Sequence, residues 1–148
     1  MRSFALLAVT AVLALAGCGN AEQNDYVSDV NQATTTMTKA LNSIGQVNPS
    51  DPSSVEKTLN SGSQTMEKAA KDFEAIDPPD NAKHAHEQMV AGLHSLATTF
   101  KDAAAAAKAK DTQKMLELLG NIGSGDGAKK IQAAQQELQK NGYKFQDS

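Results

Sequence analysis

Three histidines, His84, His86 and His94, are the residues of this chain best suited to hold a metal ion. Two helical residues share one ion when they lie three or four positions apart on one face. His84 and His86 are two positions apart, whereas His86 and His94 are eight apart, or about 12 Å along a helix axis. No Glu-x-x-His run supplies a carboxylate beside either of them. The spacing therefore predicts no metal site.

His86 differs from the other two histidines because it falls on an apolar seam with Met89 and Leu93. A histidine in such a seam is more often a hydrogen-bonded packing residue than a ligand. We expect His86 to be partly buried, neutral and hydrogen-bonded, and to make the corner at Pro78-Pro79 rigid. The candidate hydrogen-bond partners are Tyr26, Thr34 and Tyr143.

The methionines offer a second interpretation of His86. One of them falls in each of four apolar segments: Met37, Met66, Met89 and Met115. Methionine and histidine together are axial ligands of haem in some helical proteins. Methionine is also a common gap-filler in helical cores, and the chain has no Cys-x-x-Cys-His run for covalent haem attachment. A metal- or haem-carrying bundle that uses His86 is therefore the alternative, and packing is the first interpretation.

The sequence carries no signature of a common catalytic site. It has no Gly-x-Ser-x-Gly run, and the glycine-rich stretch Gly123–Gly127 lacks the lysine and hydroxyl residue of a phosphate loop. The nearby carboxylates of Asp72, Glu74 and Asp77 have the spacing of a solvated helix face. We therefore expect no enzyme activity, no catalytic residue and no cofactor.

The only cysteine, Cys18, ends the run Leu15-Ala16-Gly17-Cys18. Arg2 gives a short positive region, and residues 4–16 are almost wholly apolar. That length is typical of a secretory signal and is too short to span a bilayer as a helix. Small residues after an apolar stretch mark a cleavage site, so residues 1–17 are predicted to be a signal peptide.

The run before Cys18 resembles the lipobox of bacterial lipoproteins. In that family the thiol receives a diacylglyceryl group, the chain is cut before the cysteine, and the new N-terminus is acylated. The resemblance implies a protein held by the lipid on Cys18 at the extracytoplasmic face of the cell membrane, and two or more acyl chains anchor stably. Because Gly19 and not aspartate follows, it also implies export to the outer membrane in a host that has one. The polar residues 18–24 are expected to form a flexible tether.

Composition limits the partners of the remaining chain. Once residues 1–17 are removed, 131 of the 148 residues remain, with 13 lysines, 17 acidic residues and no arginine. Arginine is the residue that usually binds phosphate and carboxylate groups through two parallel hydrogen bonds. Its absence and the net negative charge argue against a nucleic-acid partner. The length suits one domain over residues 25–148, and a single cysteine allows no internal disulfide.

Apolar residues recur every three or four positions over residues 25–46, 54–76 and 80–110, and again between Asp111 and Asn141. This period indicates four amphipathic helices, and Asp111 is expected to cap the last of them. No segment has the alternation of a strand. Long helices joined by short turns pack as antiparallel neighbours, so we predict an all-α, up-down-up-down four-helix bundle.

The last helix is expected to break near Gly123–Gly127. Ile122 and Ile131 are nine positions apart, half a turn out of phase in a continuous helix. Four interior glycines would also cost roughly 1 kcal/mol each. The alternative is a continuous helix in which Gly120, Gly123 and Gly127 share one face and form a glycine groove.

A second resemblance concerns the middle of the chain, where Pro78-Pro79 is followed seven residues later by His86. The flanking apolar residues are Phe73, Ile76, Val90, Leu93 and Leu96. Together with the Lys110-Asp111 turn and the Gly142-Tyr143 ending, this pattern is similar to that of small exported all-helical lipoproteins of actinobacterial type. The resemblance implies a fold and a location in the cell envelope but no mechanism. We therefore expect a binding or interaction module of the cell envelope, whose partner is an envelope protein or a small apolar ligand held between helices.

Overall fold

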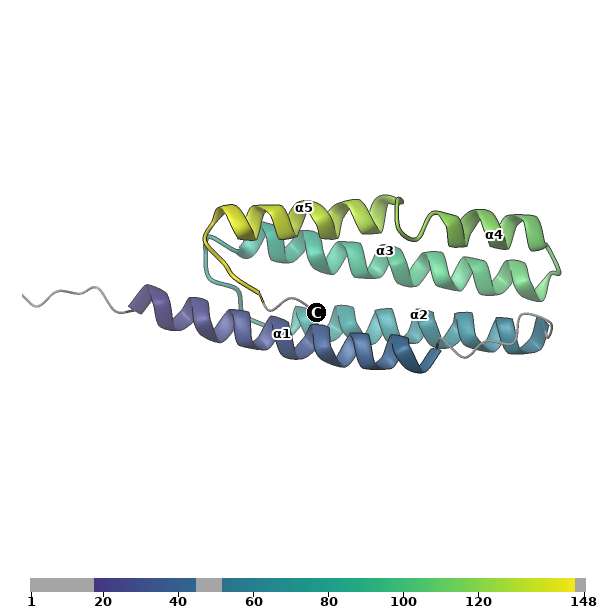
Figure 1. The fold of residues 1–148 in the computed structure, drawn as a ribbon, viewed down its shortest axis with the longest axis horizontal. Helices are drawn as coiled ribbons and strands as arrows, with labels where there is room; N and C mark the ends of the chain where they lie inside the picture. Colours follow the sequence, from purple (N-terminus) through teal and green to yellow (C-terminus); the bar gives the residue numbers. More distant parts are fainter. Residues whose placement is uncertain (1–17, 45–51, 146–148) are drawn as a thin grey trace, which may run out of the picture.

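The computed structural model describes residues 18–44 and 52–145, which form five α-helices (Figure 1). They are α1 (Cys18–Ile44), α2 (Pro52–Glu74), α3 (Lys83–Lys108), α4 (Thr112–Gly120) and α5 (Asp126–Lys140). These two ranges contain no strand, so the all-α prediction is confirmed.

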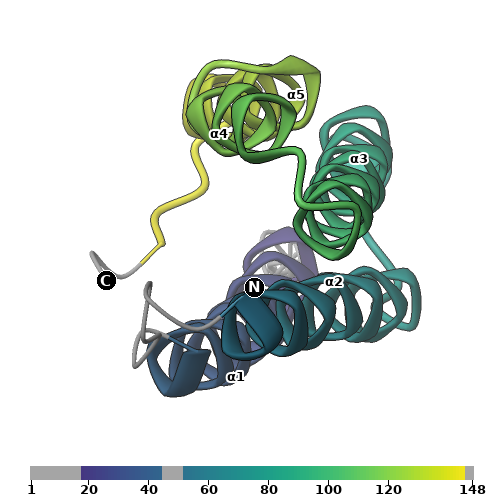
Figure 2. The ribbon, with the colours of Figure 1, turned by 90° about the vertical axis from the view of Figure 1, so that its right-hand side faces the viewer.

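Consecutive long helices run in opposite directions and pack side by side (Figure 1). The backbone of α2 lies against both α1 and α3, and α3 also lies against α4 and α5. α4 and α5 follow one another along α3 in the same direction, as both the side view and the end view show (Figures 1 and 2). Helix α3 is therefore the central element, with a neighbour on either side along its whole length.

α1 and α5 do not complete a closed ring of helices. No Cα atom of α1 lies within 8 Å of a Cα atom of α5. The chain after α5 instead crosses from the end of that helix toward the α1 side of the molecule (Figure 2). A closed bundle would bring its first and last helices into contact, so this side of the protein is open along the backbone.

The core consists of two apolar clusters. The larger one contains the bulkiest fully buried side chains, which are Tyr26, Phe73, Leu93 and Leu138. The smaller one packs Leu59 of α2 against buried alanines from the Ala103–Ala107 run of α3. Because alanine is small, this part of α3 can lie close to both neighbouring helices.

α3 and α5 approach each other closely at two glycines. A Cβ atom on Gly92 would lie 2.8 Å from the Gly127 carbonyl oxygen and 2.6 Å from Cγ1 of Ile131. A Cβ atom on Gly127 would lie 2.8 Å from the Gly92 carbonyl oxygen. Both positions therefore need glycine, and the contact fixes α5 against α3.

The predicted break in the last helix is confirmed and lies at residues 121–125, between α4 and α5. The Gly125 N–H donates to the Asn121 carbonyl oxygen at 2.6 Å, and a Cβ atom on Gly125 would lie 2.6 Å from that oxygen. Gly120 and Gly123 have open space where a side chain would be. They do not line a continuous glycine groove, so that alternative is wrong.

Helix α1 begins at Cys18, seven residues before the expected start at Asp25. The expectation of a flexible tether over residues 18–24 is therefore wrong: this segment is helical. The physical reason lies in its composition, because Ala21, Glu22 and Gln23 are good helix formers. The predicted signal peptide, residues 1–17, lies outside the described residues.

Two helices end on a residue with positive φ, Lys110 after α3 (60°) and Gly142 after α5 (89°). The N–H of the following residue donates back to the helix in each case, from Asp111 to the Ala106 carbonyl at 2.9 Å and from Tyr143 to the Leu138 carbonyl at 3.0 Å. This is the Schellman stop. The first stop positions Asp111, whose side chain accepts from the Lys114 N–H at 2.9 Å and caps α4 as predicted.

Candidate functional site

His86 lies on α3, close to the corner that joins α2 to α3. It is 6% exposed and packs between Phe73 of α2 and Tyr26 of α1. The Tyr26 hydroxyl lies 3.2 Å from His86 Nδ1. The predicted burial and hydrogen bonding of His86 are confirmed, and Tyr26 is its side-chain partner. Tyr143, another of the candidates, packs edge-on against the Tyr26 ring at 5.5 Å instead.

Burial makes the His86–Tyr26 pair neutral. Desolvation lowers the pKa of His86 below its ordinary value, while a hydrogen bond with the Phe73 backbone and the charge of Glu87 act in the opposite direction. A neutral imidazole has one donor and one acceptor. One imidazole nitrogen of His86 donates its N–H to the Phe73 backbone, so the other nitrogen, Nδ1, accepts from the Tyr26 hydroxyl. Burial, with a smaller contribution from Tyr143, raises the pKa of Tyr26 to about 12, so the phenol keeps its proton.

Asn81, in the corner between α2 and α3, ties this corner to the end of α5. The Tyr143 hydroxyl donates to Asn81 Oδ1 at 2.6 Å, and Asn141 Nδ2 donates to the Asn81 carbonyl oxygen at 2.7 Å. These bonds hold residues 142–145, which we call the C-terminal segment, at the same end of the molecule as His86. The aromatic contacts of Tyr143 continue this connection to α1.

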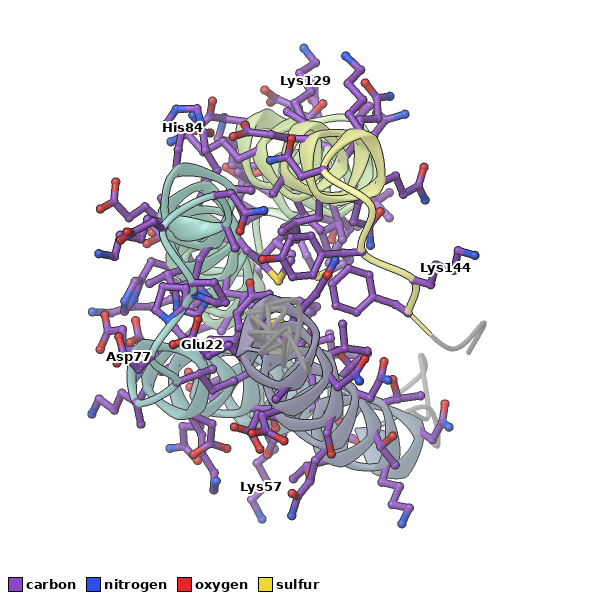
Figure 3. All side chains as sticks on the ribbon, turned by 90° about the vertical axis from the view of Figure 1, so that its left-hand side faces the viewer. Glu22, Lys57, Asp77, His84, Lys129 and Lys144 are labelled. Atoms are coloured by element: carbon purple, nitrogen blue, oxygen red, sulfur yellow. The ribbon has the colours of Figure 1, made fainter. Side chains whose placement is uncertain are left out.

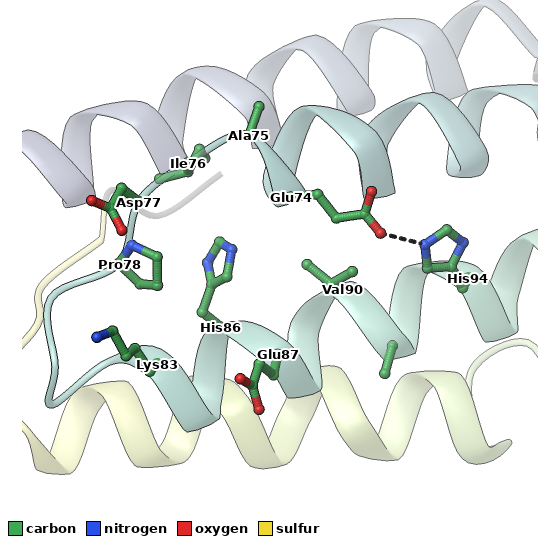
Figure 4. A pocket seen from close by; sticks show the side chains of 11 residues that line it. Glu74, Ala75, Ile76, Asp77, Pro78, Lys83, His86, Glu87, Val90 and His94 are labelled. Atoms are coloured by element: carbon green, nitrogen blue, oxygen red, sulfur yellow. Dashed lines mark hydrogen bonds and ion pairs between the residues drawn. The ribbon is translucent and has the colours of Figure 1, made fainter.

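An open pocket of about 650 Å³ lies beside His86, between the end of α2 and the first half of α3 (Figure 4). Its lining includes Ile76, Pro78 and Val90, with Glu74, Asp77 and Glu87 among its charged groups. His94 Nε2 lies 3.0 Å from Glu74 Oε1 at one end of the pocket (Figure 4). The pocket offers an apolar wall with an acidic margin.

The three histidines do not share a site. His84 Nδ1 lies 2.8 Å from Glu137 of α5, and His94 Nδ1 lies 3.3 Å from Glu67 of α2, so each joins α3 to a neighbour at the surface. Over residues 18–44 and 52–145, no three His, Cys, Asp or Glu side chains gather as metal ligands. A haem or metal ion on Nδ1 of His86 would have to displace Tyr26.

A second cavity, of about 530 Å³, lies where α1 and α5 fail to meet. We call it the α1–α5 groove. Its apolar lining comes from four helices: Val30, Met37, Phe73, Met89, Leu93 and Ile131, with Tyr143 and Phe145 from the C-terminal segment. Its polar lining is Asn31, Thr34, Gln135, Gln139 and Lys144. A mostly apolar cleft of this volume with a few polar groups is typical of small-molecule sites.

The apolar pattern of the sequence does not predict this groove. Met37 and Met89 lie on apolar seams, and both seams face inward. A seam, however, predicts only the direction of a side chain and not the distance to the next helix. The groove depends on that distance, because it lies where α1 and α5 do not meet.

Cys18 is the first residue of α1, and its side chain lies outside what the structure describes. Its lipidation therefore stays a prediction.

The C-terminal segment lies close to α1, since a Cβ atom on Gly142 would be 3.8 Å from Gln23 Nε2. Within the described residues, no helix combines the length and apolar character needed to cross a bilayer.

No protein-family model matches this sequence, and no curated protein and no solved structure is significantly similar to it.

Proposed function

We propose that this protein is an extracytoplasmic lipoprotein, anchored through Cys18, whose helical body binds a small apolar molecule in the α1–α5 groove. In this proposal the body is an up-down-up-down bundle in which α4 and α5 together take the place of the fourth helix. The observation that supports binding best is the groove itself, about 530 Å³ of mostly apolar space along the open side of the protein.

The lining of the groove favours binding over catalysis. Each ligand methylene that leaves water for such a lining stabilises the complex by about 0.8 kcal/mol. Met37 and Met89 can adjust their shape to a ligand because the methionine side chain is unbranched and flexible. His86 is not among the residues that line this groove, and its Nδ1 faces Tyr26.

The anchor supports the same proposal through its position. The run Leu15-Ala16-Gly17-Cys18 has the features of a lipobox, and α1 begins directly at Cys18. The start of α1 and the C-terminal segment lie at the same end of the molecule (Figure 1). An anchored Cys18 would hold this end of the groove near the membrane surface, where apolar molecules are concentrated.

Photo-crosslinking of the full chain in its native membranes tests the binding proposal. The probe is hexadecanol with a diazirine on its chain, and labelled peptides are identified by mass spectrometry. We expect labelling at the peptides that contain Met37 and Met89. Thr34→Phe, which fills the groove from α1, should reduce this labelling about tenfold, equivalent to about 1.4 kcal/mol.

Thr35→Phe is the matched control, because Thr35 is exposed on the same helix and is not a lining residue of the groove. It should leave the labelling unchanged. Equal labelling of both variants, or labelling spread over the outer surface, would contradict the proposal.

The anchor is tested separately by mass spectrometry of the intact protein from membranes. We expect loss of residues 1–17 and a diacylglyceryl group on Cys18. A free thiol at Cys18, or retention of the first 17 residues, would contradict the anchoring proposal and leave the groove unaffected.

A further inference from the structure

We infer that the ligand of the α1–α5 groove is a single-chain amphiphile with an anionic head, its chain between the helices and its head beside Lys144. The inference rests on the proposed function, since it names the chemical class that the same groove would take. It follows from the shape of the groove, from its polar edge and from the distribution of charge around it.

The shape of the groove suits an extended chain. Its lining runs from Val30 to Met37 along α1 and from Ile131 to Gln139 along α5. At 1.5 Å per residue, both stretches are about 10–12 Å long. A cavity that follows two helices over this length accepts a chain laid parallel to them. The Tyr143 and Phe145 rings, stacked with an interplanar angle of 11°, belong to the same lining.

The polar edge of the groove supplies hydrogen-bond donors. Gln135 and Gln139 lie one turn apart on α5, and both are exposed. Thr34 faces the groove from α1. A glutamine amide has two N–H donors and a threonine hydroxyl has one. A head that carries several acceptor oxygens, such as a carboxylate or a phosphate, fits this edge.

The charge of Lys144 favours an anionic head over a neutral or cationic one. Lys144 is the only charged residue among the described residues that line the groove. Its side chain extends outward into solvent, while Glu22 and Asp77 lie on the other side of α1 in this view (Figure 3). An ammonium group binds carboxylate and phosphate oxygens through charge-assisted hydrogen bonds.

The acidic residues of α5 do not offset this charge. Asp126 Oδ2 lies 2.7 Å from Lys130 Nζ, and Glu137 Oε2 lies 2.8 Å from His84 Nδ1. Neither carboxylate lines the groove. The chain carries a net negative charge as a whole, and the charge of Glu22 reaches Tyr143 in the lining, so among the described lining residues Lys144 alone supplies positive charge at the groove.

The test compares four photoactivatable probes with one diazirine-bearing hexadecyl chain and different heads: carboxylate, phosphate, hydroxyl and trimethylammonium. The full chain is labelled in its native membranes. We expect the two anionic probes to label groove peptides about tenfold more than the hydroxyl probe, and the trimethylammonium probe to label least. A preference between carboxylate and phosphate distinguishes a free fatty acid from a single-chain (lyso) phospholipid as the source.

Lys144→Gln should reduce labelling by the anionic probes to the level of the hydroxyl probe and leave the hydroxyl probe itself unchanged. Lys140→Gln is the matched control, since this lysine ends α5 and does not line the groove. It should keep the preference.

Equal labelling by all four heads, or an unchanged preference in Lys144→Gln, would overturn the assignment of the head while groove binding stood. Absence of labelling by every probe would overturn the proposed function as well. The two failures are therefore distinguishable.

Discussion

At the scale of single residues, the His86–Tyr26 pair is a structural contact and not an acid–base couple. Both groups are buried, burial favours the neutral form of each, and one hydrogen bond of 3.2 Å joins them. The pair connects α1 to α3, and Tyr143 extends the connection to the C-terminal segment. His86 therefore contributes to the arrangement of the helices around the groove.

The lowered pKa of His86 makes stability depend on pH. An unfolded imidazole takes up its proton near pH 6.5, and the folded one does so only at lower pH. Between these values the unfolded state binds more protons, so the free energy of unfolding should fall as the pH decreases below about 6.5. Urea titrations at pH 7.5 and 5.5 measure this loss.

His86→Phe should reduce the loss, because it removes the titrating group from the core. His84→Gln, which removes an exposed histidine from the same helix, should not. A loss of stability that is the same in the wild-type protein and in His86→Phe would contradict the assignment to His86.

Part of this residue-level arrangement could be predicted from the sequence. The position of His86 on an apolar seam was enough to predict its burial, since a seam faces the core. The choice of Tyr26 over Tyr143 could not be predicted, because the two tyrosines lie 60 and 57 positions from His86 in the chain. Only the packing of α1 against α2 and α3 decides which hydroxyl reaches the imidazole.

At the scale of helices, the two Schellman stops are built differently. Gly142 adopts its positive φ without steric cost, whereas Lys110 adopts φ of 60° with a Cβ atom that this region disfavours by about 1 kcal/mol or more. We expect Lys110→Gly to raise the free energy of unfolding by about 1 kcal/mol. Gly142→Ala should lower it by a similar amount. Urea denaturation of the two variants measures both changes.

The two expected changes in the free energy of unfolding have opposite signs. Each variant is therefore a control for the other, because both substitutions alter the same position of the Schellman motif. If Lys110→Gly destabilised the protein, the cost assigned to the backbone at this residue would be wrong. Lys110 is exposed, so loss of its side chain removes no core contact.

The helices themselves were well predicted, because a period of three and four over twenty residues is a strong signal. The break at residues 121–125 was predicted from glycine content and from the phase of Ile122 and Ile131. The start of α1 cannot be predicted, because a polar segment with good helix formers has no apolar period to reveal it. The α1–α5 groove cannot be predicted, because periodicity carries no information on the spacing between helices.

At the scale of the whole molecule, α1 is the least attached long helix. Its backbone approaches only α2, whereas α3 lies against α2, α4 and α5. Segments with fewer neighbours open at lower free energy. We expect the amides of α1 to exchange with deuterium about tenfold faster than those of α3, a difference of about 1.4 kcal/mol in opening. Exchange followed by mass spectrometry on the full chain measures this ratio.

Occupancy of the groove should slow exchange in α1 more than in α2, because α1 supplies one wall of the groove. Thr34→Phe serves as a comparison in which that wall is altered without an added ligand. Protection of α1 equal to that of α3 would show that side-chain packing alone holds α1 as firmly as the centre of the protein.

One wall of the groove and the route to the anchor are the same helix, since α1 starts at Cys18 and continues to Ile44. Any tension between the membrane and the body of an anchored protein would be transmitted through α1 before it reached the other helices. Because Val30, Thr34 and Met37 of the same helix line the groove, a pull on Cys18 would act on this wall before any other.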